Sequence, residues 1–160
     1  MLWDGFSEFL SQSSPYVPPD ILVIHLGGND LAQMPGKELI LKVTADLSAF
    51  NSHFPQTRLV WFTLVPHIVW RSAHDPRQMD KARKGVNKEV ARAFRNSLCS
   101  VTQQPEIRFS HPELNRQDGV HLSDLGLEIF LRDLQGSLEA ELLSCVAGKE
   151  HTEQLLSGGG

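Results

Sequence analysis

The stretch ILVIHLGGND, residues 21–30, decides the fold class of this chain. Its first six residues are apolar except for His25, and an apolar run of this kind that ends at glycines is typical of a buried strand in a parallel sheet. The glycines permit a tight turn at the end of the strand. The Asn29 amide can then place a hydrogen-bond donor in the crevice at the carboxyl end of the sheet.

Strand and helix patterns alternate along the rest of the chain. Helical spacing of apolar residues predicts helices near residues 2–10, over 36–54, over 76–99, and after Ser123, which can cap the last helix. Apolar or β-branched runs predict further strands at residues 59–65 and 107–109. We therefore expect an α/β domain of three layers, α/β/α, around a parallel, doubly wound, flavodoxin-like sheet.

Length and composition are those of one ordinary domain. The chain has 160 residues, of which 41% are hydrophobic and 21% charged. We expect the domain at residues 1–143 and a flexible tail at 144–160, which ends in three glycines. No stretch has the pattern of a signal peptide or the length of a membrane span, and Cys99 and Cys145 are too few for a disulfide scaffold, so we expect a cytoplasmic protein without membrane contact.

A second polar loop reads Asp118-Gly119-Val120-His121. A carboxylate three residues from an imidazole can accept the ring N–H and stabilise the imidazolium that forms when the histidine takes up a proton. His121 is therefore a candidate general base and Asp118 its orienting carboxylate. Taken alone, each of the two loops is better explained as an ordinary turn.

Together, and in this order, the two loops resemble a known family. Gly27-x-Asn29-Asp30 resembles the third conserved block of the SGNH hydrolases, also called the GDSL esterase/lipase superfamily, and Asp118-x-x-His121 resembles the fifth. The resemblance implies that Asn29 is an oxyanion-hole donor beside the catalytic pair, with Gly28 as part of its loop. It also implies serine-dependent hydrolysis of a small ester or acylated substrate, without a metal or an organic cofactor.

The chain departs from this family at its beginning. The family opens with a strand that ends in a Gly-Asp-Ser-like block, and neither that strand nor that block is recognisable here. The early serines have the wrong setting, since they lie on or after the first predicted helix: Ser7, Ser11, Ser13 and Ser14. We expect a domain that lacks its first strands and its nucleophile, and that is inactive alone.

The predicted strand at residues 21–26 also indicates that part of the sheet is missing. A strand like residues 21–26 in a parallel sheet needs neighbours on both edges, and an open apolar edge is an aggregation liability. We therefore expect an upstream segment or a partner to complete the sheet. Two alternatives remain: a non-catalytic binding or interaction module on the same fold, and a flavodoxin-like or receiver-like domain in which Asp30 is the functional acid.

Other candidates carry less weight. His67, Trp70 and Arg71 follow the second strand and are possible pocket residues, whereas His25 is expected to be a hydrogen-bonded core histidine. A metal site that combines His111 with the second loop lacks a recognisable ligand spacing, and we expect no metal. The basic face over residues 71–95 is interpreted as a solvated helix face, since the net charge of −4 makes nucleic acid an improbable partner.

Overall fold

The computed structural model describes residues 2–12, 17–70, 75–95 and 99–157. Its sheet consists of β1 (Ile21–Ile24), β2 (Arg58–Phe62) and β3 (Cys99–Thr102). The strands are parallel and lie in the order β1-β2-β3, with Ile21 opposite Arg58 and Leu59 opposite Cys99. The expected α/β class with a parallel sheet is confirmed.

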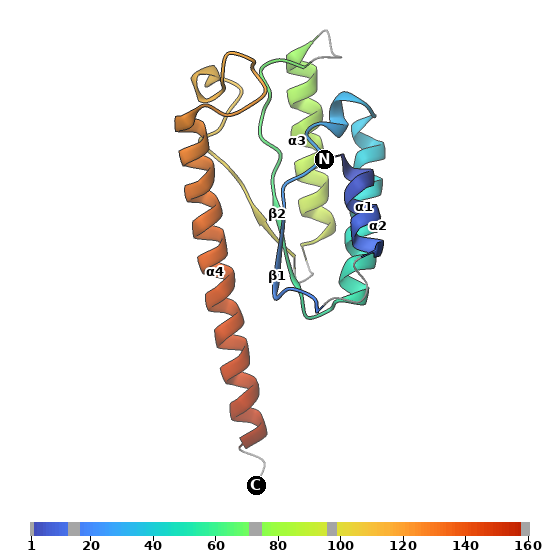
Figure 1. Ribbon diagram of the computed structural model, residues 1–160, viewed down its shortest axis with the longest axis vertical. Coiled ribbons are helices and arrows are strands. Elements are labelled where there is room, and N and C mark those ends of the chain that lie inside the picture. Colours follow the sequence, from blue (N-terminus) through green and yellow to red (C-terminus); the bar gives the residue numbers. More distant parts are fainter. Residues whose placement is uncertain (1, 13–16, 71–74, 96–98, 158–160) are drawn as a thin grey trace.

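Helices lie on both faces of the sheet (Figure 1). One face carries α1 (Trp3–Gln12), α2 (Gly36–His53) and α3 (Pro76–Ala93), and the other carries α4 (Asp124–Ser157). Two short 3-10 helices, η1 (Asp30–Ala32) and η2 (Pro112–Leu114), lie in the loops that follow β1 and β3. None of the described helices combines the length and the apolar character that crossing a bilayer requires.

Strand β2 is the centre of the core. Four consecutive side chains of this strand, Leu59 to Phe62, are at most 1% exposed, because they alternate between the two helical layers. Leu59 and Trp61 belong to the large core cluster together with residues of α1, α2 and α3. Phe62 points the other way and meets Phe130 of α4 edge-on, with the ring centroids 4.7 Å apart.

Strand β3 is formed by other residues than those predicted from the sequence. The third strand is formed by Cys99–Thr102, so the expected strand at residues 107–109 is wrong, and α3 ends at Ala93 instead of near Cys99. Cys99 and Val101 alternate with polar Ser100 and Thr102, which is the pattern of a half-buried edge strand and not of a long apolar run. Ile107 is buried instead in a small second cluster with Val65 and Leu114.

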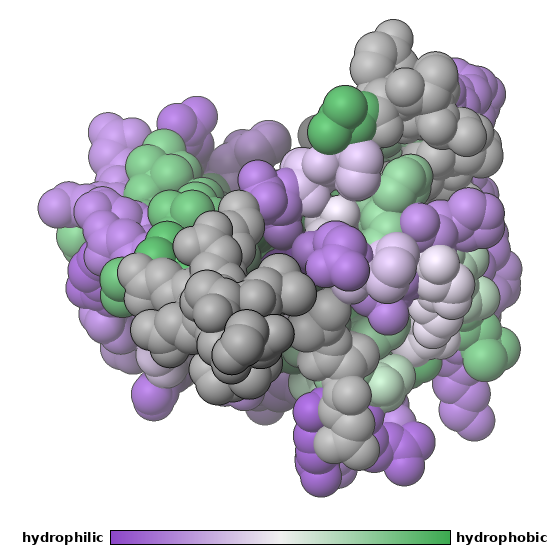
Figure 2. Space-filling model, turned by 90° about the horizontal axis from the view of Figure 1, so that it is seen from below, coloured by the Kyte–Doolittle hydropathy of each residue, from purple (hydrophilic) through white to green (hydrophobic). Residues whose placement is uncertain are grey.

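Helix α4 is longer than expected. Its backbone is helical as far as Ser157, where we expected a flexible tail from residue 144, and residues 158–160 lie outside the described part. Figure 2, which shows the end of the molecule at which α4 ends, has apolar surface on the side of this helix. Leu142, Leu143 and Val146 are all more than half exposed there. The far part of α4 therefore extends beyond the layer that the sheet provides (Figure 1).

Trp3 attaches α1 to the rest of the domain. Its side chain is fully buried, and its backbone N–H donates to Oδ1 of Asp30 at 2.9 Å. Its indole Nε1 donates to Oδ2 of Asp46 on α2 at 2.7 Å, and its ring lies near those of Phe6 and Trp61. A carboxylate at the first turn of a helix is favourable, because the N-terminal N–H groups carry partial positive charge.

Trp3→Ala is expected to lower the free energy of unfolding by about 3–5 kcal/mol, the usual cost of truncating a buried aromatic residue. Trp3→Phe keeps a ring in the core and removes the indole donor to Asp46, so its cost should be smaller, about 1–2 kcal/mol. Urea denaturation followed by circular dichroism measures both. A Trp3→Ala protein that is as stable as the wild type would show that α1 does not contribute to the fold.

The surroundings of His25 disfavour its protonated form. The residue is exposed and is therefore not the core histidine that we expected, although its Nδ1 lies 3.1 Å from the carbonyl of Phe62 and its ring meets that of Phe130 edge-on at 4.9 Å. Loss of hydration among these neighbours lowers the pKa of His25 below the ordinary histidine value, although backbone carbonyls of Phe62 and Thr63 partly oppose the shift. As the pH falls, the unfolded chain therefore binds a proton at this residue before the folded chain does.

We expect the free energy of unfolding to decrease as the pH falls from about 6.5, the histidine pKa in an unfolded chain, toward the lower pKa of folded His25. In His25→Gln this part of the pH dependence should be lost. Urea denaturation of both proteins between about pH 5 and pH 7.5 tests it, since that range spans the histidine titration. Parallel curves for the two proteins would contradict the assignment.

Candidate active site

The loop after β1 separates the two polar residues of the first motif. Gly27 has a φ of +109°, which favours glycine, and its carbonyl accepts a hydrogen bond from the N–H of Leu31 at 3.1 Å. This turn places Asn29 at the start of η1 with an exposed side chain. Asp30 is only 1% exposed and holds the N–H of Trp3, so it faces the core and lacks the role that a receiver-like domain would give it.

The second loop is closed by its own backbone. The N–H of Arg116 donates to the carbonyl of His121 at 2.8 Å, and the N–H of Gly119, which has a φ of +67°, donates to the carbonyl of Arg116. Oδ1 of Asp118 accepts the N–H groups of Val120 and His121 at 2.8 and 2.9 Å. These bonds leave Oδ2 of Asp118 free for the imidazole.

The expected contact between Asp118 and His121 is present. Oδ2 of Asp118 lies 2.7 Å from Nδ1 of His121. The hydrogen bond from the His121 ring, followed by those from the N–H groups of His121 and Val120, holds the pKa of Asp118 well below its usual range. The carboxylate is therefore ionised and can only accept, so Nδ1 carries the proton. This arrangement turns Nε2 away from Asp118, and Nε2 is the nitrogen that would accept a proton in general-base catalysis.

Two close backbone approaches fix the position of this loop. The carbonyl of Gly119 accepts the N–H groups of Ile68 and Val69 at 2.6 and 3.0 Å, which joins it to the loop after β2. At Gly126, in the first turn of α4, an added Cβ would lie 2.2 Å from the carbonyl oxygen of Leu114, so only glycine fits without a shift. Ser123 precedes α4, and its Oγ accepts the N–H of Gly126 at 3.2 Å, as expected for a capping residue.

One pocket of about 650 Å³ collects residues from the loops after β1 and β2 and from the Asp118–His121 loop. Asn29, Gly28 and His121 line it, together with His67 and Trp70 from the loop after β2. Gly27 and Asp30 support the first loop from behind and do not line the pocket. Arg71 lies outside the described residues. Residues far apart in the sequence thus meet in one pocket, as the parallel topology requires.

His67 and Trp70 form one wall of this pocket. Their rings are tilted by 33° with centroids 4.6 Å apart, and Nε1 of Trp70 donates to the carbonyl of His67 at 2.9 Å. Burial lowers the pKa of His67, and the nearby His121, His25 and Arg83 lower it further, so its ring is neutral at pH 7. A Cβ added at Gly28 would touch the His67 ring at 3.6 Å, an ordinary van der Waals contact, so the packing itself does not require glycine there.

Several lining residues were not predicted from the sequence. Val69 lies next to Trp70, Val120 lies inside the predicted Asp118–His121 loop without a role of its own, and Ala32 and Gln33 lie about one helical turn beyond Asn29. The only sequence signal for this wall was that two ring-bearing residues, His67 and Trp70, follow shortly after a buried strand. The contact of Val69 with Gly119 depends on tertiary structure and has no signature in the sequence.

The described residues that line this pocket include no serine, threonine or cysteine. Two of the early serines, Ser7 and Ser11, lie on α1, and the other two lie outside the described residues. His111 pairs with Glu113 at 2.9 Å instead of approaching His121. Across the described part of the chain, no group of three or more His, Cys, Asp or Glu residues could hold a metal ion.

No family model and no curated protein sequence matches the chain, whereas solved structures do. A Bacteroides fragilis protein assigned as an acylhydrolase superposes with a TM-score of 0.69 at 12% identity, over 89% of this chain and 72% of the other. A GDSL-like lipase from Bacteroides thetaiotaomicron gives 0.67 at 14%, over 88% and 72%. A family 3 carbohydrate esterase from Clostridium thermocellum gives 0.63 at 16%, over 91% and 69%.

These identities are low, so what the structures share with this chain is the fold. The shared region spans nearly the whole chain but only about 70% of each of these proteins, as the shares of 72% and 69% indicate. The fold of this chain is therefore that of acylhydrolases, GDSL-like lipases and carbohydrate esterases, which is the SGNH-type fold expected from its two motifs.

Proposed function

We propose that this chain forms the larger part of an SGNH-type ester hydrolase domain. In this proposal His121 is the general base, Asp118 orients it, and Asn29 donates to the oxyanion. The observation that carries the proposal is the 2.7 Å contact between Asp118 and His121 beside a pocket that Asn29 also lines. The substrate is a small ester or an acylated molecule, and the chemistry requires neither a metal nor an organic cofactor.

The proposed reaction is acyl transfer to water by way of a serine. The serine oxygen attacks the ester carbonyl while its proton moves to Nε2 of His121, and ionised Asp118 stabilises the imidazolium that forms. The negative charge on the carbonyl oxygen is stabilised by the side-chain N–H of Asn29. His121 then returns the proton to the leaving alcohol, and water repeats the sequence on the acyl-enzyme.

The serine, in our proposal, comes from a segment or partner other than the described residues. Two features support this. His121 is open, with 70% of its side chain exposed, and no hydroxyl or thiol lines the pocket among the described residues. The outer edge of β1 is unpaired within the described sheet, although Ile21, Leu22 and Val23 are apolar.

A strand added in parallel beside β1 would cover the unpaired edge of β1 and could also supply the serine. It would cover the open N–H and C=O groups of β1, which is a common way of joining an extended segment to a sheet. Its carboxyl end would lie beside the loop that carries Asn29, because parallel strands end at the same edge of a sheet. A serine at that end would therefore approach Nε2 of His121.

A second candidate function is binding without turnover. The same pocket, with the neutral His67 ring and Trp70 as its wall, could hold an acyl or sugar ligand. The lack of a nucleophile among its described lining residues favours this alternative for the chain alone. Saturable binding of an ester that is recovered intact would distinguish it from the hydrolase proposal.

The isolated chain is expected to hydrolyse short nitrophenyl esters no faster than its His121→Ala variant, because none of the described residues that line the pocket with the imidazole is a serine, threonine or cysteine. Release of nitrophenolate measures both rates. A rate that is lost in His121→Ala and blocked by a serine-directed fluorophosphonate would contradict this expectation. Mass spectrometry of the labelled protein would then identify the serine.

A longer protein, in which an added strand ending in Gly-x-Ser pairs with β1, is expected to be soluble and active. In that protein Asn29→Ala should lower kcat by about 10²–10³, the usual cost of removing an oxyanion-hole donor. Gln33→Ala, which alters a neighbouring residue of the same pocket, is the matched control and should keep most of the activity. Equal kcat values for Asn29→Ala and the parent protein would refute the oxyanion role.

A further inference from the structure

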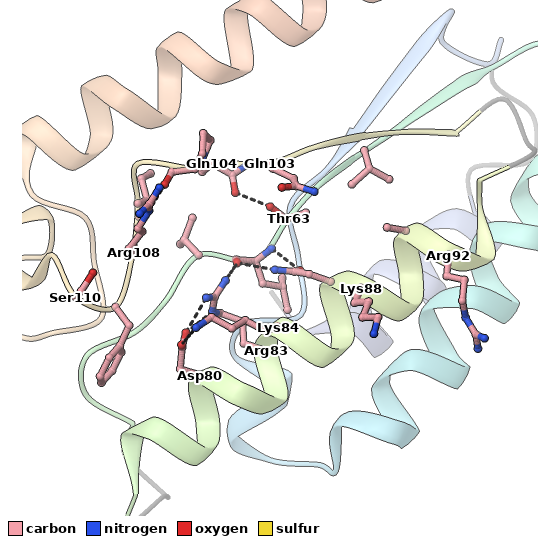
Figure 3. A pocket seen from close by; sticks show the side chains of 18 of the residues that line it. Thr63, Asp80, Arg83, Lys84, Lys88, Arg92, Gln103, Gln104, Arg108 and Ser110 are labelled. Carbon is pink, nitrogen blue, oxygen red and sulfur yellow. Dashed lines mark hydrogen bonds and ion pairs between the residues drawn. The ribbon is translucent and has the colours of Figure 1, made fainter.

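A second pocket, of about 920 Å³, lies between α3 and the segment that runs from β3 to Ser110. It shares no lining residue with the candidate active site. Figure 3 shows α3 with Lys84 and Lys88 on one side, and Gln103, Gln104 and Arg108 on the other. Its volume is within the range of small-molecule sites.

The charges around this pocket are strongly unbalanced. Its lining includes six cationic side chains and one carboxylate: Arg83, Lys84, Lys88, Arg92, Arg95 and Arg108 against Asp80. Arg83 and Lys84 share Asp80 at 2.7 Å each, and Arg92 pairs with Glu89. Lys88, Arg95 and Arg108 form no ion pair with any described carboxylate. A surplus of positive charge on a chain whose net charge is −4 is therefore concentrated at one place.

Arg83 brings a buried cation to the inner wall. Only 10% of its side chain is exposed, and its guanidinium donates to Oδ1 of Asp80 through Nε and Nη2 and to the carbonyl of Leu64 through Nη1 at 2.6 Å. These bonds use three of the five N–H groups of a guanidinium. Because Asp80 and Leu64 hold its position, the remaining N–H groups are pre-organised for an oxygen ligand.

Part of the pocket floor is apolar, beside the hydrogen-bonded pair Thr63 and Gln104 (Figure 3). Val101 and Cys99 of β3 line it together with Leu64, Val65 and Ile107. Inorganic phosphate or another small anion would gain nothing from such a floor, and an uncharged lipid would gain nothing from the cations. The combination matches an amphipathic anion, with an aliphatic body on the floor and an anionic head at the cations.

A nucleic-acid strand fits the pocket less well. Binding of single strands combines a cationic track with aromatic side chains on which bases stack, and Phe109 is the only aromatic residue among the described lining. Lys84, Lys88 and Arg92 do lie in a row along α3 (Figure 3), but no aromatic side chains for stacking alternate with them on the helix.

We propose that this pocket binds a single amphipathic anion, a carboxylate or phosphate head group attached to an aliphatic chain. Arg83, Lys88 and Arg108 contact the head group, and the β3 floor takes the chain. This inference is independent of the proposed hydrolase activity.

The test uses the whole chain and four probes: dodecanoate and dodecyl phosphate, both below their critical micelle concentrations, dodecanol at or below its solubility limit, and inorganic phosphate. Isothermal titration calorimetry should detect saturable binding of dodecanoate or dodecyl phosphate, and the stronger of the two identifies the head group. Dodecanol and inorganic phosphate should bind at least about tenfold more weakly, since each lacks one of the two kinds of contact.

Lys88→Glu/Arg108→Glu should weaken binding of the preferred probe by about tenfold or more, because charge-assisted contacts become repulsive. Lys81→Glu, a charge reversal at an exposed residue of α3 outside the pocket, should change it by less than about twofold, since surface charges act weakly at a distance. Circular dichroism checks that each variant is folded.

Three outcomes would overturn the proposal. The first is the absence of binding by both amphipathic probes, and the second is equal affinity in the double variant and in Lys81→Glu. The third is binding of dodecanol or of inorganic phosphate as tight as that of the amphipathic probes. Adsorption to vesicles that contain anionic lipid, without binding of the monomeric probes, would count as the first outcome.

Discussion

The structure depends on the burial of β2 between two parallel neighbours. This strand has hydrogen-bonded partners on both edges and helices on both faces, so none of its backbone or side-chain groups from Leu59 to Phe62 reaches water to any extent. Parallel pairing requires a long crossover between successive strands, and α2 and α3 are those crossovers. The same pairing brings the carboxyl ends of the strands to one edge, where Asn29 and His121 meet.

This constraint also explains which elements could be predicted from the sequence. β2 is buried on both faces and is therefore apolar throughout, so its run at residues 59–65 was recognisable. β1 is only partly buried, but its unbroken apolar run at residues 21–24 gives the same signal, and the helices that cover the sheet had clear apolar stripes. Edge strand β3 is only half buried and alternates Cys99 and Val101 with polar residues, whereas Ile107 owes its burial to loop packing. The short run Ile107-Arg108-Phe109, which lies outside the sheet, was therefore predicted as the third strand in place of Cys99–Thr102.

The candidate site was predictable to a similar extent. Asp118 and His121 are close in sequence, so their contact follows from a local turn that the sequence determines. His67 and Trp70 were recognisable as possible pocket residues, but that they face His121 depends on packing between distant segments. The basic face over residues 71–95 was also visible in the sequence and was interpreted as solvated, whereas the sequence does not show that Arg108 lies across a pocket from it.

The carbonyl of Gly119 has a consequence for how the site opens. It accepts the N–H groups of both Ile68 and Val69, so the loop that carries His121 and the loop that carries His67 cannot separate without breaking both bonds. Segments linked in this way open together as one cooperative unit. The amide hydrogens of Ile68 and Val69 should then be protected from exchange to the same degree, relative to their intrinsic rates. That protection reports how often the two loops separate.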